Sequence, residues 1–117
     1  MKRIILVFVL IIAITGCSSE KYGGSVNKEL PRTMIKDILL NPELEGKTVN
    51  LEGIIISQCA SSGCWFFLKD ATGQVLVDLA PHGFTLPPKM GKTVRITGIP
   101  EKRQGGMKIA AQGVEIN

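Results

Sequence analysis

The chain has 117 residues, with 14 Lys and Arg against 10 Asp and Glu and a formal net charge of +4. A chain of this length builds one domain with a small core, and it leaves no room for a second domain. The modest, intermixed charge argues against a nucleic-acid-binding protein, which normally shows a concentrated basic surface.

The first 16 residues have the composition of an export signal. Lys2 and Arg3 precede an apolar run over residues 4–14, and small residues then lead to Cys17. The run is shorter than the roughly 20 apolar residues that a membrane-spanning helix needs. We therefore expect residues 1–16 to be removed on export. This lowers the formal net charge from +4 to +2, because Lys2 and Arg3 are lost.

Residues 14–17, Ile-Thr-Gly-Cys, resemble the lipobox of bacterial lipoproteins, with Ile14 in the position of the usual leucine. The resemblance implies that Cys17 receives a diacylglycerol and acyl chains such as palmitate, and that it becomes the first residue of the mature protein. The domain is then lipid-anchored in the cell envelope and faces the periplasm or the cell exterior. An ordinary secretory signal with an incidental cysteine is the alternative.

The segment after Cys17 has the composition of a linker. Residues 18–30 are polar and contain a Gly-Gly pair, which favours a flexible tether. We accordingly divide the chain into a lipoprotein signal peptide at 1–16, a lipidated tether at 17–32 and a folded domain at 33–117.

The folded domain is predicted to contain one helix followed by five strands. Thr33 is a candidate N-cap, and Asn41-Pro42 ends the helix. Strand-like stretches bounded by turn residues lie at 48–58, 64–70, 74–80, 91–103 and 107–116. Gly53 indicates a bend or bulge in the first of them. Five short strands without a spare apolar face favour closure, so the predicted fold is mainly β: a small five-stranded OB-like closed barrel with one short N-terminal helix.

The order of these elements, with the stretches GKTVNLEGII, WFFLKDATGQVLVDL and GKTVRITGI, resembles bacterial OB-fold domains of the anticodon-binding (tRNA-anti-like) type. It is more similar to exported members of that group whose function is not established and which carry a cysteine pair ahead of the second strand. The resemblance covers about residues 35–116 and implies the OB fold. The group's helix between strands three and four is replaced here by PHGFTLPPKM, where Pro87 and Pro88 prevent a regular helix. We expect Phe84 and Leu86 to close that end of the barrel.

The second and third strands are predicted to carry a binding face. Their inward positions are Phe66, Leu68, Val75, Val77 and Leu79, which make an apolar core. The outward positions include Trp65, Phe67, Lys69 and Leu76, on the face that OB-folds use to stack ligands or bind partners. The alternative is that Ile35, Ile38 and Leu39 of the helix cover the two aromatic rings.

Cys59 and Cys64 flank a four-residue loop between the first and second strands. In the simplest register they oppose each other across the ladder, close enough for a disulfide, and an oxidising envelope favours that bond. Such a short loop gives about 2 kcal/mol of stabilisation. Thiol-redox chemistry is an alternative, and it requires a depressed cysteine pKa.

A metal site is the other alternative for the cysteines. The third strand returns beside Cys64, and His82 follows two residues after that strand. Two thiolates and one imidazole suit zinc with an open fourth position, or copper(I).

No arrangement of side chains indicates an enzyme, since Asp70 and Asp78 are expected on opposite faces and Ser61 and Ser62 have no evident base. The sequence therefore predicts a membrane-anchored lipoprotein whose barrel binds an envelope protein or a small ligand without a cofactor. The alternative is a metal-handling or thiol-redox envelope protein that acts through the two cysteines and His82. Nucleic acid is not expected as a partner, because the lipid anchor separates the domain from cytoplasmic RNA.

Overall fold

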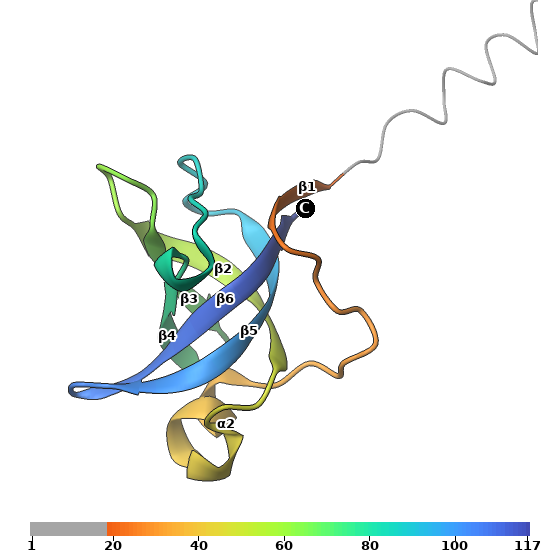
Figure 1. The fold of residues 1–117 in the computed structure, drawn as a ribbon, viewed down its shortest axis with the longest axis vertical. Helices are drawn as coiled ribbons and strands as arrows, with labels where there is room; N and C mark the ends of the chain where they lie inside the picture. Colours follow the sequence, from red (N-terminus) through yellow and green to blue (C-terminus); the bar gives the residue numbers. More distant parts are fainter. Residues whose placement is uncertain (1–18) are drawn as a thin grey trace, which may run out of the picture.

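The computed structural model describes residues 19–117, and the predicted signal and Cys17 lie outside the described residues. The strands are β1 (Glu20–Gly23), β2 (Val49–Gln58), β3 (Trp65–Asp70), β4 (Gly73–Asp78), β5 (Thr93–Arg103) and β6 (Gly106–Ile116). The helix α2 (Ile35–Leu40) and two 3₁₀ turns, η1 (Pro42–Leu44) and η2 (Ala80–His82), complete the elements of this range (Figure 1). No helix within residues 19–117 is long and apolar enough to cross a membrane.

Strands β2 to β6 form the closed barrel that the sequence predicts. They pair in the order β6-β4-β3-β2-β5, and β5 also pairs with β6, which closes the ring. The first half of β2 pairs with β5 and its second half with β3. Gly53 lies near this change of partner, where a Cβ would meet the carbonyl oxygen of Lys69 at 2.3 Å. A glycine is therefore needed for the two strands to approach each other there.

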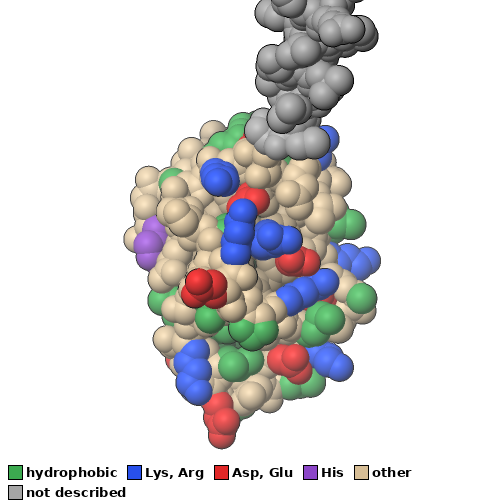
Figure 2. All heavy atoms as spheres, turned by 90° about the vertical axis from the view of Figure 1, so that its right-hand side faces the viewer, with side chains coloured by type: hydrophobic (Ala, Val, Ile, Leu, Met, Phe, Trp, Pro, Cys, Tyr) green, Lys and Arg blue, Asp and Glu red, His purple; other side chains and the backbone are tan. Residues whose placement is uncertain are grey.

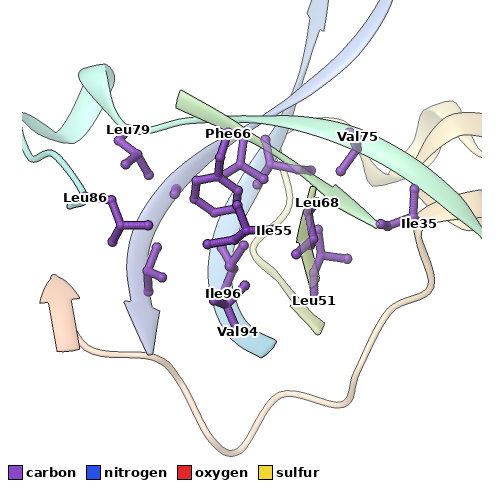
Figure 3. Close-up of a cluster of buried hydrophobic side chains, with 14 of the residues drawn as sticks. Ile35, Leu51, Ile55, Phe66, Leu68, Val75, Leu79, Leu86, Val94 and Ile96 are labelled. Atoms are coloured by element: carbon purple, nitrogen blue, oxygen red, sulfur yellow. The ribbon is translucent and has the colours of Figure 1, made fainter. Parts of the chain in front are cut away.

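The barrel interior is filled by side chains from all five of its strands (Figure 3). The inward positions predicted for β3 and β4 are confirmed, because all five are buried: Phe66, Leu68, Val75, Val77 and Leu79. Ile35 and Ile38 of α2 and Leu86 of the loop before β5 belong to the same cluster. Helix and loop therefore help to close the core. Phe84 also packs against it, so both side chains that were expected at this end of the barrel contribute to the core.

Helix α2 is capped from β3 and not from its own N-cap residue. Met34 occupies the N-cap position and makes no side-chain capping bond, so the predicted Thr33 cap is wrong. The backbone N–H of Ile35 donates instead to Oδ2 of Asp70 at 2.9 Å, and Thr72 donates to Oδ1. Burial raises the pKa of the Asp70 carboxyl, but the hydrogen bonds from Thr72, Ile35 and Gly73 outweigh it, so that the net pKa is lowered.

The segment predicted as a flexible tether packs on the barrel where the structure describes it. Residues of β1 pair with β6 in antiparallel register, from Glu20 opposite Ile116 to Gly23 opposite Gly113. Further along, the N–H of Asn27 donates to Oγ1 of Thr97 at 2.8 Å. The prediction of a free linker at residues 18–30 is therefore wrong for this part. The reason is that β4 pairs with only a short part of one edge of β6. The rest of that edge is available to an extra strand, and β1 occupies it.

Charged side chains of both signs are interspersed over the face shown in Figure 2. Two of the ion pairs of the described residues are Arg95 with Glu52 at 2.9 Å and Lys28 with Glu115 at 4.0 Å. Such mixing differs from the concentrated basic surface of nucleic-acid-binding proteins.

Candidate functional site

The outer face of β3 and β4 carries two aromatic side chains next to each other. Trp65 lies opposite Asp78 in the register, and Phe67 lies opposite Leu76. The Trp65 and Phe67 rings meet edge to face, with centroids 5.9 Å apart and an interplanar angle of 81°. Both side chains are half-buried. The structure thus brings three of the four predicted face residues together, namely Trp65, Phe67 and Leu76.

These residues line a hollow of about 290 Å³, here called the aromatic hollow, whose walls are Trp65, Phe67, Leu76, Asp78 and Arg103. Helix α2 contributes no residue to it. Ile35 and Ile38 are turned into the core, as Figure 3 shows for Ile35, and Leu39 lines a neighbouring hollow with Phe67. The helix therefore does not cover Trp65, and of the three helix residues in the predicted alternative Leu39 is the one that shares a hollow with Phe67. The helix is held at the barrel end because Asp70 caps it there.

The aromatic hollow has a positive charge at its rim. Oδ2 of Asp78 accepts from Nζ of Lys108 at 3.0 Å, which neutralises that carboxylate. Arg103 makes no ion pair with any residue that the structure describes. Lys69, predicted for this face, is exposed and does not line the hollow.

Sequence reasoning missed Arg103, which lies at the end of β5. It reaches the hollow because β6, the partner of β5, also pairs with β4 in a short parallel ladder from Leu76 to Asp78. Alternation along single strands carries no signal for such a long-range pairing.

The cysteines lie in the loop between β2 and β3, but they do not oppose each other directly. The N–H of Cys59 donates to the carbonyl of Trp65 at 3.1 Å, which places Trp65 opposite Cys59. The predicted direct opposition of Cys59 and Cys64 is wrong by one residue. Both thiols are free and half-buried in the structure.

The hydroxyl of Ser62 lies close to both sulfurs. Its Oγ is 3.3 Å from Sγ of Cys59 and 3.2 Å from Sγ of Cys64. Hydrogen bonds from the Ser62 side chain, and then from the Ser62 backbone and from Ser61, lower the pKa of Cys59 from its ordinary value of 9.0 to about 5. The lowered pKa favours the thiolate form of Cys59 when the pair is reduced.

Gly63 fixes this loop against the segment before β5. Its φ is +62°, and a Cβ would meet the carbonyl oxygen of Leu86 at 2.2 Å. Gln58 makes a second connection, because its Nε2 donates to the carbonyl of Pro87 at 2.8 Å and its Oε1 accepts from the N–H of Lys89 at 2.9 Å. The two loops together enclose a second hollow of about 440 Å³. This cysteine hollow is lined by residues 58–63, Leu86, Pro88 and Met90.

His82 does not join the cysteines. It is exposed at the end of η2 and does not line the cysteine hollow. Among residues 19–117, no group of three or more His, Cys, Asp or Glu side chains lies close enough to hold a metal ion. The predicted convergence of Cys59, Cys64 and His82 is therefore not formed. The short 3₁₀ turn ends in Gly83 with a φ of 70°, and the chain turns away there.

Comparison with known proteins identifies the N-terminal segment. The family model described as "Prokaryotic membrane lipoprotein lipid attachment site" matches residues 1–18, which include Cys17. The chain therefore carries a lipoprotein attachment site, and this supports a lipid-anchored envelope protein. No curated protein matches the chain.

Solved structures resemble the barrel. Asparaginyl-tRNA synthetase from Pyrococcus horikoshii aligns with a TM-score of 0.57 and 18% identity, over 75% of this chain and 23% of the synthetase. The hypothetical protein ygiW from E. coli aligns with a TM-score of 0.52 and 24% identity, over 88% of this chain and 100% of ygiW. The OBody AM1L10, solved bound to hen egg-white lysozyme, aligns with a TM-score of 0.54 and 21% identity, over 80% of this chain and 96% of the OBody.

The chain thus spans less than a quarter of the synthetase, and all three identities lie below 25%. At this level the comparisons show a shared fold and no more. The described domain is an OB-like barrel that follows a lipoprotein attachment site.

Proposed function

We propose that this protein is a membrane-anchored lipoprotein whose barrel binds a segment of an envelope protein in the aromatic hollow. The bound segment carries an aromatic or aliphatic side chain next to a carboxylate. One observation carries the proposal: Trp65 and Phe67 line an open hollow that α2 leaves uncovered and that Arg103 borders.

The chemistry of the hollow supports this type of ligand. Trp and Arg are enriched among the residues that contribute most to protein–protein binding, and a half-buried aromatic pair provides a rigid apolar contact. The guanidinium of Arg103 is suited to a planar carboxylate, which it binds with two parallel hydrogen bonds. The OBody is described as bound to lysozyme, so a barrel of similar fold is able to bind a protein.

The fluorescence of Trp65 tests the proposal, because Trp65 is the only tryptophan of the chain. The probes are two short peptides, Gly-Asp-Phe-Gly and its amide counterpart Gly-Asn-Phe-Gly, each with blocked ends. We expect a saturable change of Trp65 emission with the acidic peptide and a weaker one with the amide. Arg103→Gln should abolish the difference, whereas Lys47→Gln, which removes an exposed charge outside the hollow, should preserve it. Equal responses of Arg103→Gln and the unchanged protein to both peptides would contradict the role of Arg103.

A second candidate function is thiol–disulfide exchange, favoured by the hydroxyl of Ser62 between the two sulfurs. In this reaction the Cys59 thiolate attacks a disulfide of a partner protein, forms a mixed disulfide and releases one partner thiolate. Cys64 then gives its proton to the released partner thiolate, and its sulfur attacks Sγ of Cys59 and releases the second partner thiolate. The Cys59–Cys64 disulfide remains, and two electrons have passed to the partner. The lowered pKa of Cys59 supports its role as the attacking residue.

A further inference from the structure

The site of lipidation and the first strand lie close together in the chain. Only two residues separate Cys17 from Glu20, where β1 begins. At no more than about 3.6 Å per residue, the Cα of Glu20 lies within about 11 Å of the Cα of Cys17. The inference that follows rests on lipidation of Cys17, which places that residue at the membrane surface.

Strand β1 is held firmly on the barrel. Its four residues pair with β6, and Oε2 of Glu20 accepts from Nζ of Lys89 at 2.8 Å. The hydroxyl of Ser19 also donates to Oε1 of Glu115 at 3.0 Å. The short spacer therefore keeps the barrel end around Glu20 near the bilayer. Helix α2 lies at the opposite end in Figure 1.

The barrel end near Glu20 exposes apolar side chains. Ile54, Ile56 and Met90 are 46%, 40% and 64% exposed, and they are three of the five large apolar side chains exposed among residues 19–117. They lie around one turn, because Ile55 bonds through its backbone to both Gly91 and Lys92. The start of β5 at this turn is tied to the C-terminus, where the N–H of Asn117 donates to the carbonyl of Thr93 at 3.2 Å. Glu20 pairs with the preceding residue, Ile116.

A lysine accompanies these apolar side chains. Lys92 is exposed, and it makes no ion pair with a residue that the structure describes. Apolar side chains that enter the headgroup region, beside lysines that meet lipid phosphates, are the features of a surface that binds an anionic bilayer.

We propose that the barrel end formed by Ile54, Ile56, Met90 and Lys92 rests on the anionic phospholipid surface that holds the Cys17 lipid. The cysteine hollow, which Met90 also lines, then opens beside the bilayer. Arg103 lies at the far end of the 11-residue strand β5, so the aromatic hollow stays accessible to a partner.

Lysine acetylation of the lipidated protein in vesicles tests this orientation. The vesicles are phosphatidylcholine alone or phosphatidylcholine with phosphatidylglycerol, the reagent is membrane-impermeant, and mass spectrometry measures the rate at each lysine. We expect Lys92 to react about fivefold more slowly on the anionic vesicles, and we expect high salt to reduce this protection. Lys36 of α2 and Lys47 should react equally on both.

Two variants, each of an exposed apolar side chain, distinguish docking of this barrel end on the bilayer from simple anchoring through the Cys17 lipid. Met90→Asp should restore the reaction rate of Lys92, whereas Leu40→Asp on α2, where Leu40 is 79% exposed, should leave the protection unchanged. Both side chains are exposed, so both variants should keep the circular dichroism spectrum of the unchanged protein. The proposal would be overturned if Lys92 reacted at equal rates on both vesicle types, or if Lys36 were protected instead. It would also be overturned if Lys92 remained protected in Met90→Asp. None of these outcomes depends on whether the aromatic hollow binds peptides.

Discussion

Sγ of Cys59 lies 3.3 Å from the hydroxyl of Ser62, and this contact is the largest cause of the lowered pKa of that thiol. The loop gains its thiolate-stabilising groups from two serines and not from a helix N-terminus or a cation. Serine hydroxyls placed by a tight loop thus lower the pKa of a hairpin cysteine in the direction that favours a reactive thiolate.

The first prediction concerns that pKa. In reduced protein with Cys64→Ser, the alkylation rate of Cys59 by iodoacetamide should follow a titration near pH 5, and Ser62→Ala should move it upward by about one unit or more. Because folding lowers the pKa of Cys59, its ionisation stabilises the folded, reduced protein. This contribution is fully present above pH 9.0, the ordinary pKa of the thiol, and is lost as the pH falls to about 5. A titration near pH 9 in the Cys64→Ser protein would contradict the role of Ser62.

The oxidation state of the pair is the second prediction. Protein taken from the oxidising envelope should be two hydrogens lighter than its reduced form and should not react with a thiol label before reduction. Cys59→Ser and Cys64→Ser should each reduce the free energy of unfolding of the oxidised protein by about 2 kcal/mol, while His82→Ala should leave it unchanged. Intact mass and thermal unfolding measure these effects. Two free thiols with stoichiometric zinc or copper would show a metal site instead.

The alternation of apolar and polar residues along the chain was sufficient to predict much of this fold. The buried set of β3 and β4, the outward Trp65 and Phe67 and the closed barrel all follow from period-two patterns and turn residues. The strand at Glu20–Gly23 could not be predicted in this way, because its polar residues carry no apolar alternation and it forms by occupying a free edge of β6. The Asp70 cap and the place of Arg103 depend on long-range pairing, for which a single sequence has no local signal.

The helix cap gives the third prediction. Asp70→Asn should reduce the free energy of unfolding by about 1 kcal/mol at pH 7, because the neutral side chain accepts weaker hydrogen bonds from Ile35 and Thr72. Since the pKa of Asp70 is lowered in the folded protein, ionised Asp70 contributes to the free energy of unfolding above pH 3.8, the ordinary pKa of the carboxyl. This contribution is lost as the pH falls below that value. Thermal unfolding should therefore show a larger difference from the unchanged protein at pH 7 than at pH 2.5. An equal difference at both pH values would show that the ionised carboxylate is not the cause.

Lipidation is the subject of the fourth prediction. Cys17→Ser should leave a protein without acyl chains, because no neighbouring side chain accepts the thioether lipid. Cell fractionation and intact mass of the product measure this, and an alanine at Ser18 provides a control that should remain lipidated. A processed Cys17→Ser protein that stays fully with the membrane would contradict the anchor.

The aromatic hollow is the centre of this account, and the most direct measurement compares stability with binding in Trp65→Ala. Trp65 is half-buried, so its truncation should lower the melting temperature by only a few degrees, whereas Phe66→Ala in the core should cost about 3–5 kcal/mol. Calorimetric titration with the acidic peptide Gly-Asp-Phe-Gly should show that Trp65→Ala no longer binds it, although the variant remains folded. Undiminished binding by folded Trp65→Ala, or a loss of stability as large as that of Phe66→Ala, would contradict the assignment of this hollow as the binding site.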